Sequence, residues 1–255
     1  HECEFLIFDE TLISSLVLAD MEGVAPVENT GQVRWFKRPT PGNTYLTSLD
    51  PSMGTGGDYA AIQVFELPSF EQVAEWHHNQ TPMNQQVRIL QGINKHIHDT
   101  IMEKDTSATP QIFYSMENNS IGEAALMRVM DIGEENIEGM FLSEPIRKGH
   151  RRKFRRGFNT TAKHKIDACT KFKELIENDK MKINSQLLIS ELKDFVASGM
   201  SYNAKPGQHD DLVSACLLMT RMMKVLADFD PKIFEKWTDR TSQITPMPIF
   251  GSFTG

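Results

Sequence analysis

The chain has 255 residues, of which 40% are hydrophobic and 24% charged, a composition typical of one sizeable globular domain with extensions. No apolar run approaches the ~18 to 20 residues of a membrane-spanning helix, and the start HECE lacks the basic residues of a signal peptide. We therefore expect neither a membrane protein nor a secreted one. A chain that begins with His1 also suggests a piece excised from a longer protein.

The cysteines and the charges narrow the class further. Cys3, Cys169 and Cys216 form no C-x-x-C pair, which argues against a disulfide framework or a zinc knuckle and fits a reducing cytoplasm. The net charge of −7 argues against a protein that coats nucleic acid with its whole surface. Seven of the 27 basic residues nevertheless lie within residues 147–156, RKGHRRKFRR, which contains no acid. These seven residues are Arg147, Lys148, Arg151, Arg152, Lys153, Arg155 and Arg156.

The first half of the chain predicts a connector, three strands and a helix. Residues 1–40 are expected to form an N-terminal connector. From residue 44, three β-type runs are separated by a glycine-rich turn and by a Pro-Ser turn, which predicts a three-stranded meander. His77 and His78 at its end are expected to be solvated. From Pro82, apolar residues recur at steps of three and four, which predicts a helix of about six turns.

The second half alternates strands and helices. Residues 111–117 predict a strand, and Asn118 or Asn119 is placed to cap the helix that follows it. Residues 138–144 predict another strand, Thr160 or Thr161 the start of a further helix, and residues 186–196 one more. A last helix is predicted to begin at residues 209–211. The order predicts an α/β domain over residues 41–228 with a central sheet flanked by helices, and a loosely held tail over residues 229–255.

Three carboxylates are predicted at element ends, where an open α/β sheet usually places its site. Asp50 closes the first strand of the meander, Glu117 closes the next strand along the chain, and Asp211 opens the last helix. If the two strands are parallel neighbours, Asp50 and Glu117 lie side by side. Clustered carboxylates repel one another unless a cation binds them, and hard oxygen ligands favour Mg²⁺ or Mn²⁺.

Such a centre suits hydrolysis of a phosphodiester. Two ions about 3.5 to 4 Å apart can hold the attacking water and the leaving oxygen in line, although the sequence leaves open whether one or two ions bind. The cationic segment 147–156 favours a polyanionic substrate over a small phosphate ester, because each Lys or Arg that neutralises a phosphate adds affinity without reading sequence.

Each residue also has a purely structural interpretation. A single strand-end Asp usually forms a turn, and Asp58, which follows Gly56-Gly57, either fixes its turn or supports the metal site. One of Asp210 and Asp211 is expected only to cap its helix. The loop MGTGGD favours a hairpin turn over a phosphate cradle.

Several motifs together resemble a known family. The segments ECEFL, YLTSLDPSMGTGGDY, YSMENNSIGEAAL and GQHDDLVSACLL are similar to the nuclease domain of the large terminase subunits of T4-like tailed bacteriophages, which has an RNase H-like fold with a mixed sheet. The resemblance implies metal ligands at Asp50, Asp58, Glu117 and Asp211, with Asp210 as the alternative to Asp211. Because no G-x-x-x-x-G-K-[ST] loop is present, the connector is expected to come from a missing ATPase domain.

What the resemblance implies is a metal-dependent endonuclease that cuts concatemeric viral double-stranded DNA during genome packaging. The implied partners are the portal protein, the small terminase subunit and the ATPase domain of the full-length chain. The implied location is the host cytoplasm during virus assembly. Charge reversal of Arg151, Arg152 and Arg155 is then expected to weaken DNA binding and spare the metal site.

Three alternatives stay open at this point. A Holliday-junction resolvase or transposase-type enzyme would share the fold, and a portal-docking or DNA-binding module would keep the acidic pocket without cutting. A small-molecule phosphatase would lack salt-dependent affinity for DNA.

Overall fold

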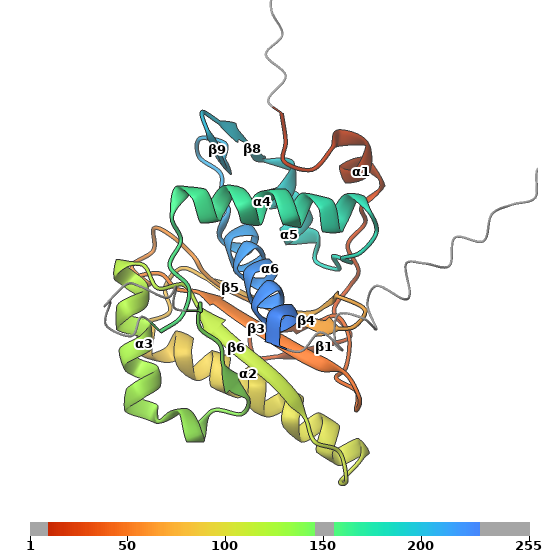
Figure 1. Ribbon diagram of the computed structural model, residues 1–255, viewed down its shortest axis with the longest axis vertical. Helices are drawn as coiled ribbons and strands as arrows, with labels where there is room; N and C mark the ends of the chain where they lie inside the picture. The colour runs from red at the N-terminus through yellow and green to blue at the C-terminus, as the bar shows by residue number, and fades with distance from the viewer. Residues whose placement is uncertain (1–9, 146–155, 230–255) are drawn as a thin grey trace, which may run out of the picture.

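The structure is a computed structural model that describes residues 10–145 and 156–229. Its centre is a seven-stranded mixed sheet in the order β1-β2-β5-β4-β3-β6-β7 (Figure 1). The strands are β1 Glu28–Thr30, β2 Val33–Trp35, β3 Thr44–Asp50, β4 Ala60–Leu67, β5 Glu71–His78, β6 Gln111–Met116 and β7 Met140–Phe141. β3 pairs antiparallel with β4 and parallel with β6, which confirms the predicted meander and the parallel neighbours.

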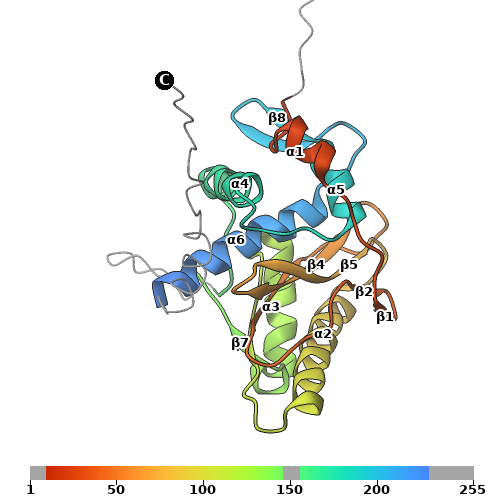
Figure 2. The ribbon, with the colours of Figure 1, turned by 90° about the vertical axis from the view of Figure 1, so that its right-hand side faces the viewer.

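Helices cover both faces of this sheet (Figures 1 and 2). One face carries α2 and α3, and the other carries α6 with α4 and α5 packed above it, next to the short helix α1. A 3₁₀ turn, Glu134–Asn136, follows α3. The helices are α1 Ser15–Asp20, α2 Met83–Lys104, α3 Ser120–Ile132, α4 Ala162–Glu177, α5 Gln186–Lys193 and α6 Asp211–Phe229. No helix in the described ranges is both long and apolar enough to span a bilayer.

The alternation of side chains along the strands produces two separate cores. On β4, Ile62 and Val64 pack into the core beneath α2, whereas Ala61 and Phe65 pack into the core beneath α6. Successive residues of a strand point to opposite faces, so strands buried on both faces are apolar on both. The sheet is therefore the middle layer of three.

Side-chain caps fix the starts of two helices at the edge where the strands end. Asn119 accepts hydrogen bonds from the backbone N–H of Ile121 and of Gly122, at 3.0 and 2.8 Å, and so begins α3. Thr161 accepts one from His164 N at 3.2 Å and begins α4. Both caps agree with the predicted ones, since a side-chain oxygen satisfies N–H groups that the first turn leaves unpaired.

Two segments differ from what the sequence predicts. The helix expected over residues 186–196 ends at Lys193, and its last residues enter a hairpin of β8 Phe195–Ser198 and β9 Ser201–Ala204. Gly199 has φ 60° in the turn, a conformation that favours glycine. Within the predicted connector, β1 pairs with β2 and β2 pairs with β5, and Trp35 is fully buried. The predicted tail from residue 230 onward lies outside the described residues.

A candidate metal centre at the sheet edge

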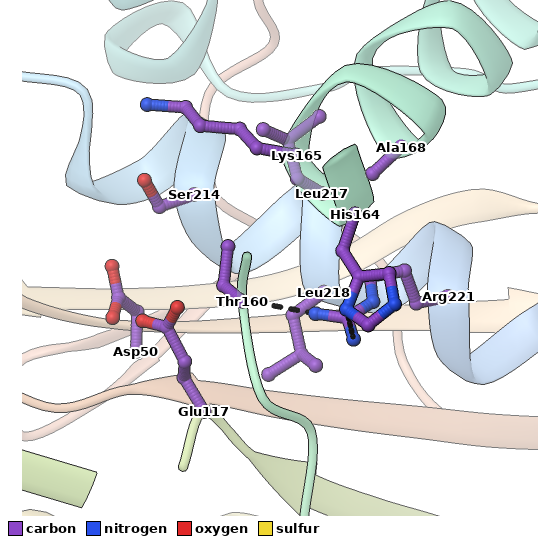
Figure 3. A pocket seen from close by; sticks show the side chains of 10 residues that line it. All are labelled: Asp50, Glu117, Thr160, His164, Lys165, Ala168, Ser214, Leu217, Leu218 and Arg221. Carbon is purple, nitrogen blue, oxygen red and sulfur yellow. Dashed lines mark hydrogen bonds between the residues drawn. The ribbon is translucent and has the colours of Figure 1, made fainter. Parts of the chain in front are cut away.

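Parallel pairing of β3 and β6 brings the first two predicted acids together. The register runs from Thr44↔Gln111 to Leu49↔Met116, and the N–H of Glu117 donates to Leu49 O at 3.2 Å. Asp50 and Glu117 therefore follow their strands at the same edge, and their carboxylates lie side by side (Figure 3).

The third acid comes from the start of α6, whose first residue is Asp211. The preceding Asp210 has structural partners: its carbonyl accepts from Ser214 N at 2.8 Å and its carboxylate accepts from Ala204 N at 3.2 Å. Asp210 therefore stands directly before α6, but the N–H group bound by its carboxylate belongs to the last residue of β9, so the expected side-chain cap stays a prediction. Within residues 10–145 and 156–229, the ionic neighbour of Asp211 is His209, with Nδ1 3.6 Å from Oδ2.

The electrostatics show that these carboxylates act on one another. Burial raises the pKa of Asp50 well above its ordinary value, and the neighbouring Glu117, Asp211 and Asp210 raise it further. Burial and the charge of Asp210 raise the pKa of Asp211 to about 6. Among the residues that the structure describes, Asp50, Glu117 and Asp211 form no ion pair with a lysine or arginine. We call Asp50, Glu117, Asp210 and Asp211 the carboxylate centre.

The glycine-rich loop after β3 is a hairpin turn, as predicted. Asp50 pairs with Ala61 across it, and a Cβ added to Gly54, whose φ is 69°, would lie 2.2 Å from Thr81 O. Asp58 is exposed in this loop, and its charge contributes to the raised pKa of Asp211. It therefore lies within electrostatic reach of the carboxylate centre, and its role as a metal ligand stays a prediction.

A cavity of about 210 Å³ opens beside Asp50 and Glu117, and its far wall carries cations that the sequence did not single out (Figure 3). Lys165 Nζ donates to Asn203 Oδ1 at 2.8 Å and lies 4.0 Å from Asp210. Arg221 is held by Glu144 and donates to Thr160 Oγ1 at 3.0 Å. The sequence did contain a signal for Lys165. The first turn of α4 has basic residues and no acidic one, although the helix dipole favours negative charge at that end.

A second group of ligand-type side chains adjoins the centre. One ligand atom each of His77, Glu191 and Asp211 lies within 4.8 Å of the others. The prediction that His77 is solvated is wrong, because only 14% of its side chain is exposed, and burial lowers its pKa to about 4. Burial raises the pKa of Glu191 to about 9. We call His77, Glu191 and Asp211 the imidazole cluster.

The described residues on either side of the cationic segment lie beside the centre. These flanks meet there, since Glu144 N donates to Gly157 O at 3.2 Å and Asn118 N donates to Phe158 O at 2.7 Å. Arg156 is engaged with the domain through an ion pair to Glu134 and a position 5.9 Å from the Phe141 ring centre. The other predicted DNA contacts lie outside the described residues: Arg147, Lys148, Arg151, Arg152, Lys153 and Arg155.

A mixed sheet with acids at the ends of adjacent parallel strands and at the start of a helix across the sheet face defines an RNase H-like domain. The sequence pattern of the terminase RNaseH-like domain family matches residues 47–222, and the chain belongs to this family.

Solved structures of the same fold agree with this assignment. The large terminase nuclease of thermophilic phage G20c with bound magnesium is 16% identical, with a TM-score of 0.60 over 82% of this chain and 95% of that one. The large terminase nuclease domain of Thermus phage P74-26 is 16% identical, with a TM-score of 0.55 over 79% and 92%. The human cytomegalovirus terminase nuclease domain, Mn soaked and inhibitor bound, is 11% identical, with a TM-score of 0.52 over 82% and 94%.

Proposed function

We propose that this domain is a metal-dependent endodeoxyribonuclease that cuts concatemeric viral double-stranded DNA during genome packaging. Asp50, Glu117 and Asp211 are the catalytic carboxylates of this proposal, with Mg²⁺ or Mn²⁺ as the metal. The observation that carries it is the meeting of three carboxylates, without a lysine or arginine paired to them in the described ranges. Two of them, Asp50 and Glu117, line a cavity that Lys165 and Arg221 line as well.

The donor atoms fit such an ion. Three buried or half-buried carboxylates offer oxygens only, which hard divalent cations prefer. The pKa values of Asp50 and Asp211 are raised first by burial and then by the charge of neighbouring acids, and a bound cation would offset both effects. Magnesium and manganese are the ions named with two of the structural relatives.

The chain's own residues supply position and charge. Asp50 and Glu117 would hold the metal from the sheet, and Asp211 would hold it from α6. When bound, the metal would polarise the scissile phosphodiester and lower the pKa of the attacking water. Lys165, on the facing wall, is placed to bind a non-bridging phosphate oxygen, as a preorganised cation does for developing charge.

Residues 147–156 would hold the DNA backbone next to the centre, because both flanks of this segment lie beside Glu117. Contacts to phosphates carry no sequence information, so we expect little cut-site preference. The proposal includes the portal protein, the small terminase subunit and an ATPase domain as partners, and the host cytoplasm as the location. Asp58 and Asp210 are supporting ligands in this scheme.

The test is cleavage of supercoiled plasmid by the domain with Mg²⁺ or Mn²⁺. Asp50→Asn, Glu117→Gln and Asp211→Asn are expected to lower the rate about a thousandfold, since loss of several kcal/mol of metal stabilisation removes that factor. Asp99→Asn, an exposed acid on α2 across the sheet, is the matched control and keeps the rate.

Binding of a labelled duplex is measured in parallel. Cutting by the native chain that a chelator stops, with DNA binding intact in the three variants, is the expected result. Intact DNA binding without any cutting by the native chain would contradict the nuclease and favour a docking module.

A further inference from the structure

We propose that His77, Glu191 and Asp211, the imidazole cluster, bind a first-row transition-metal ion at a subsite with a different donor set from that of Asp50 and Glu117. The inference deepens the proposed function, on which it rests because Asp211 belongs to both groups. The proposed subsite would have one nitrogen ligand and two oxygen ligands, whereas Asp50 and Glu117 offer oxygen ligands alone.

Three separate elements build the cluster. His77 comes from the end of β5, Glu191 from the last turn of α5, and Asp211 from the first residue of α6. His77 Nε2 lies 3.8 Å from Glu191 Oε1, and the three ligand atoms lie within 4.8 Å of one another. Metal–nitrogen and metal–oxygen bonds of about 2.0 to 2.2 Å place two ligands of one ion no more than about 4.4 Å apart. The His77–Glu191 pair already meets this limit, and a small side-chain shift brings the whole set within it.

The imidazole nitrogen has no other partner in the described part of the chain. His77 Nε2 is shielded from solvent and makes no hydrogen bond there. A buried polar atom without a partner is costly and calls for an explanation such as a bound ion. The ring is also held in place, because Tyr59 stacks on it with ring centres 4.1 Å apart and His209 packs edge-on against Tyr59 at 4.8 Å.

Glu191 divides its two oxygens between structure and ligand binding. Its Oε2 accepts a hydrogen bond from Val213 N at 3.1 Å, in the first turn of α6. Its Oε1 is the atom that faces His77. Through these two contacts Glu191 connects the first turn of α6, where Asp211 lies, to His77. Its side chain is only 10% exposed.

The donor set selects the class of ion. Imidazole suits Zn²⁺, Co²⁺ and other first-row transition metals, whereas Mg²⁺ prefers oxygen ligands and retains several waters. Within the described ranges, Glu191 and Asp211 have only histidines as ionic partners, so no lysine or arginine competes for this position. The cluster is therefore expected to take Zn²⁺ or Co²⁺ and to discriminate against Mg²⁺.

The test is titration of the metal-free domain with Co²⁺, followed by visible absorption, and with Zn²⁺ and Mg²⁺, followed by calorimetry. His77→Gln and Glu191→Gln are expected to weaken Co²⁺ and Zn²⁺ binding at this subsite by at least about ten- to a hundredfold. Both are expected to leave Mg²⁺ binding within about twofold, because neither touches Asp50 or Glu117. The amide introduced by Glu191→Gln retains an oxygen for Val213 N, so this variant keeps the fold even if His77→Gln does not.

His78→Gln is the matched control, because this neighbouring ring is engaged by Thr81 at 2.7 Å instead. A second readout is nitrogen coupling to bound Mn²⁺ or Co²⁺ in pulsed electron paramagnetic resonance. The coupling should vanish in His77→Gln and persist in His78→Gln. Unchanged Co²⁺ affinity in both His77→Gln and Glu191→Gln, or coupling lost only in His209→Gln, would overturn the subsite. Failure of the nuclease proposal would appear instead as wild-type cutting in Asp50→Asn.

Discussion

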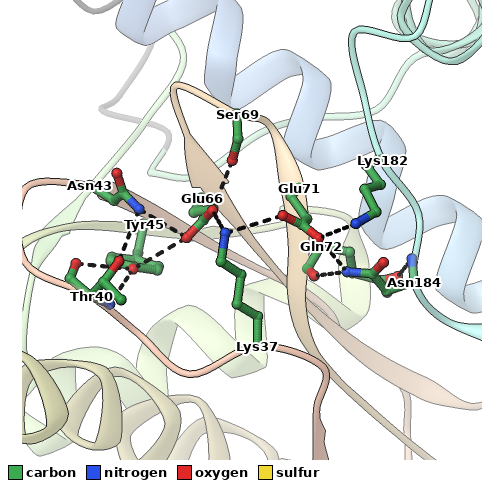
Figure 4. Close-up of polar contacts among 10 residues, drawn as sticks. All are labelled: Lys37, Thr40, Asn43, Tyr45, Glu66, Ser69, Glu71, Gln72, Lys182 and Asn184. Atoms are coloured by element: carbon green, nitrogen blue, oxygen red, sulfur yellow. Dashed lines mark hydrogen bonds and ion pairs between the residues drawn. The ribbon is translucent and has the colours of Figure 1, made fainter. Parts of the chain in front are cut away.

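Two groups of buried carboxylates on the same sheet differ in what balances their charge. In the first group, which we call the paired network, Lys37 binds Glu66 and lies 3.1 Å from Glu71 (Figure 4). Lys182 reaches Glu71 at 2.7 Å. Glu66 is 1% exposed and also accepts hydrogen bonds from Asn43 and Ser69. Here the protein provides the cations itself.

Among the residues that the structure describes, almost no cation is paired with the carboxylate centre. Lys165 reaches only Asp210, at 4.0 Å, and is also hydrogen-bonded to Asn203. The pKa values differ accordingly. Burial raises the pKa of Glu71, but hydrogen bonds from Lys182, Asn184 and Lys37 outweigh it and lower the pKa. Burial raises the pKa of Asp50, and its neighbours add to the shift.

Whether a lysine pairs with a buried acid distinguishes a structural carboxylate from one that is available to bind a metal ion. A buried charge is costly unless it is paired, so buried acids without a cation beside them destabilise the folded state. In the paired network the charge of Lys37 joins the segment before β3 to the end of β4 and the start of β5. In the carboxylate centre the missing charge is what a metal ion would bring.

The largest expected effect concerns the cation nearest the centre. Lys165→Ala should lower the rate of plasmid cutting by about a hundred- to a thousandfold, as removal of one preorganised electrostatic contact does elsewhere. Calorimetry should find the affinity for Mg²⁺ unchanged, since Lys165 is not a ligand. Lys163→Ala, an exposed lysine in the same helical turn, serves as control. A Lys165→Ala variant that cuts at the normal rate would remove this residue from the mechanism.

The same substitution should have opposite effects on the stability of the two regions. Glu66→Gln is expected to lower the free energy of unfolding by about 1 to 3 kcal/mol, because Lys37 loses one of its two charged partners and keeps only Glu71. In the presence of a chelator, Glu117→Gln should leave stability unchanged or raise it, because it removes repulsion with Asp50. Urea denaturation measures both. Equal losses in the two variants would abolish the distinction drawn between the regions.

A smaller effect is expected from pH. The folded-state pKa of Glu191, about 9, lies above its ordinary 4.5, and that of Asp211, about 6, lies above 3.8. The stability that their protons contribute is therefore complete at low pH and is lost as pH rises from about 4 to 9. Glu71 has a lowered pKa, so its contribution is lost as pH falls below its ordinary 4.5.

Thermal unfolding of the metal-free domain should thus show a melting temperature that falls between pH 6 and 9, by about 2 to 4 °C for each kcal/mol of repulsion. Glu191→Gln should flatten this fall. Added Mn²⁺ should restore the melting temperature at the alkaline end. A melting temperature that rises between pH 6 and 9 would show that the folded state does not raise the pKa values of Glu191 and Asp211.

The main acids of the site could be predicted because each occupies an element end. Asp50 and Glu117 follow apolar runs that form strands, and Asp211 starts a long apolar helix. Only the parallel pairing of β3 and β6 had to be assumed, and the structure confirms it. Both helix caps followed from equally local patterns.

His77 and Glu191 could not be found in this way, because their burial depends on distant contacts. In the sequence Glu191 resembles any solvated helix residue. It becomes buried only because α5 packs against the start of α6, where its hydrogen-bond partner Val213 lies 22 positions further along the chain. The end of α5 was missed for a local reason. The apolar residues just after α5 extend its helical pattern and so hide its end. Gly199, which forms the turn of the β8–β9 hairpin, was the residue that indicated a strand pair after the helix.

The most direct test of the account is to locate the metal. Crystals of the domain soaked in Mn²⁺ and measured at a wavelength where manganese scatters anomalously give its position without any assay of cutting. We expect an anomalous peak within bonding distance of carboxylate oxygens of Asp50 and Asp211 or Glu117, and no peak in the paired network around Glu66. Peaks that avoid the carboxylate centre, or lie at surface acids alone, would contradict it.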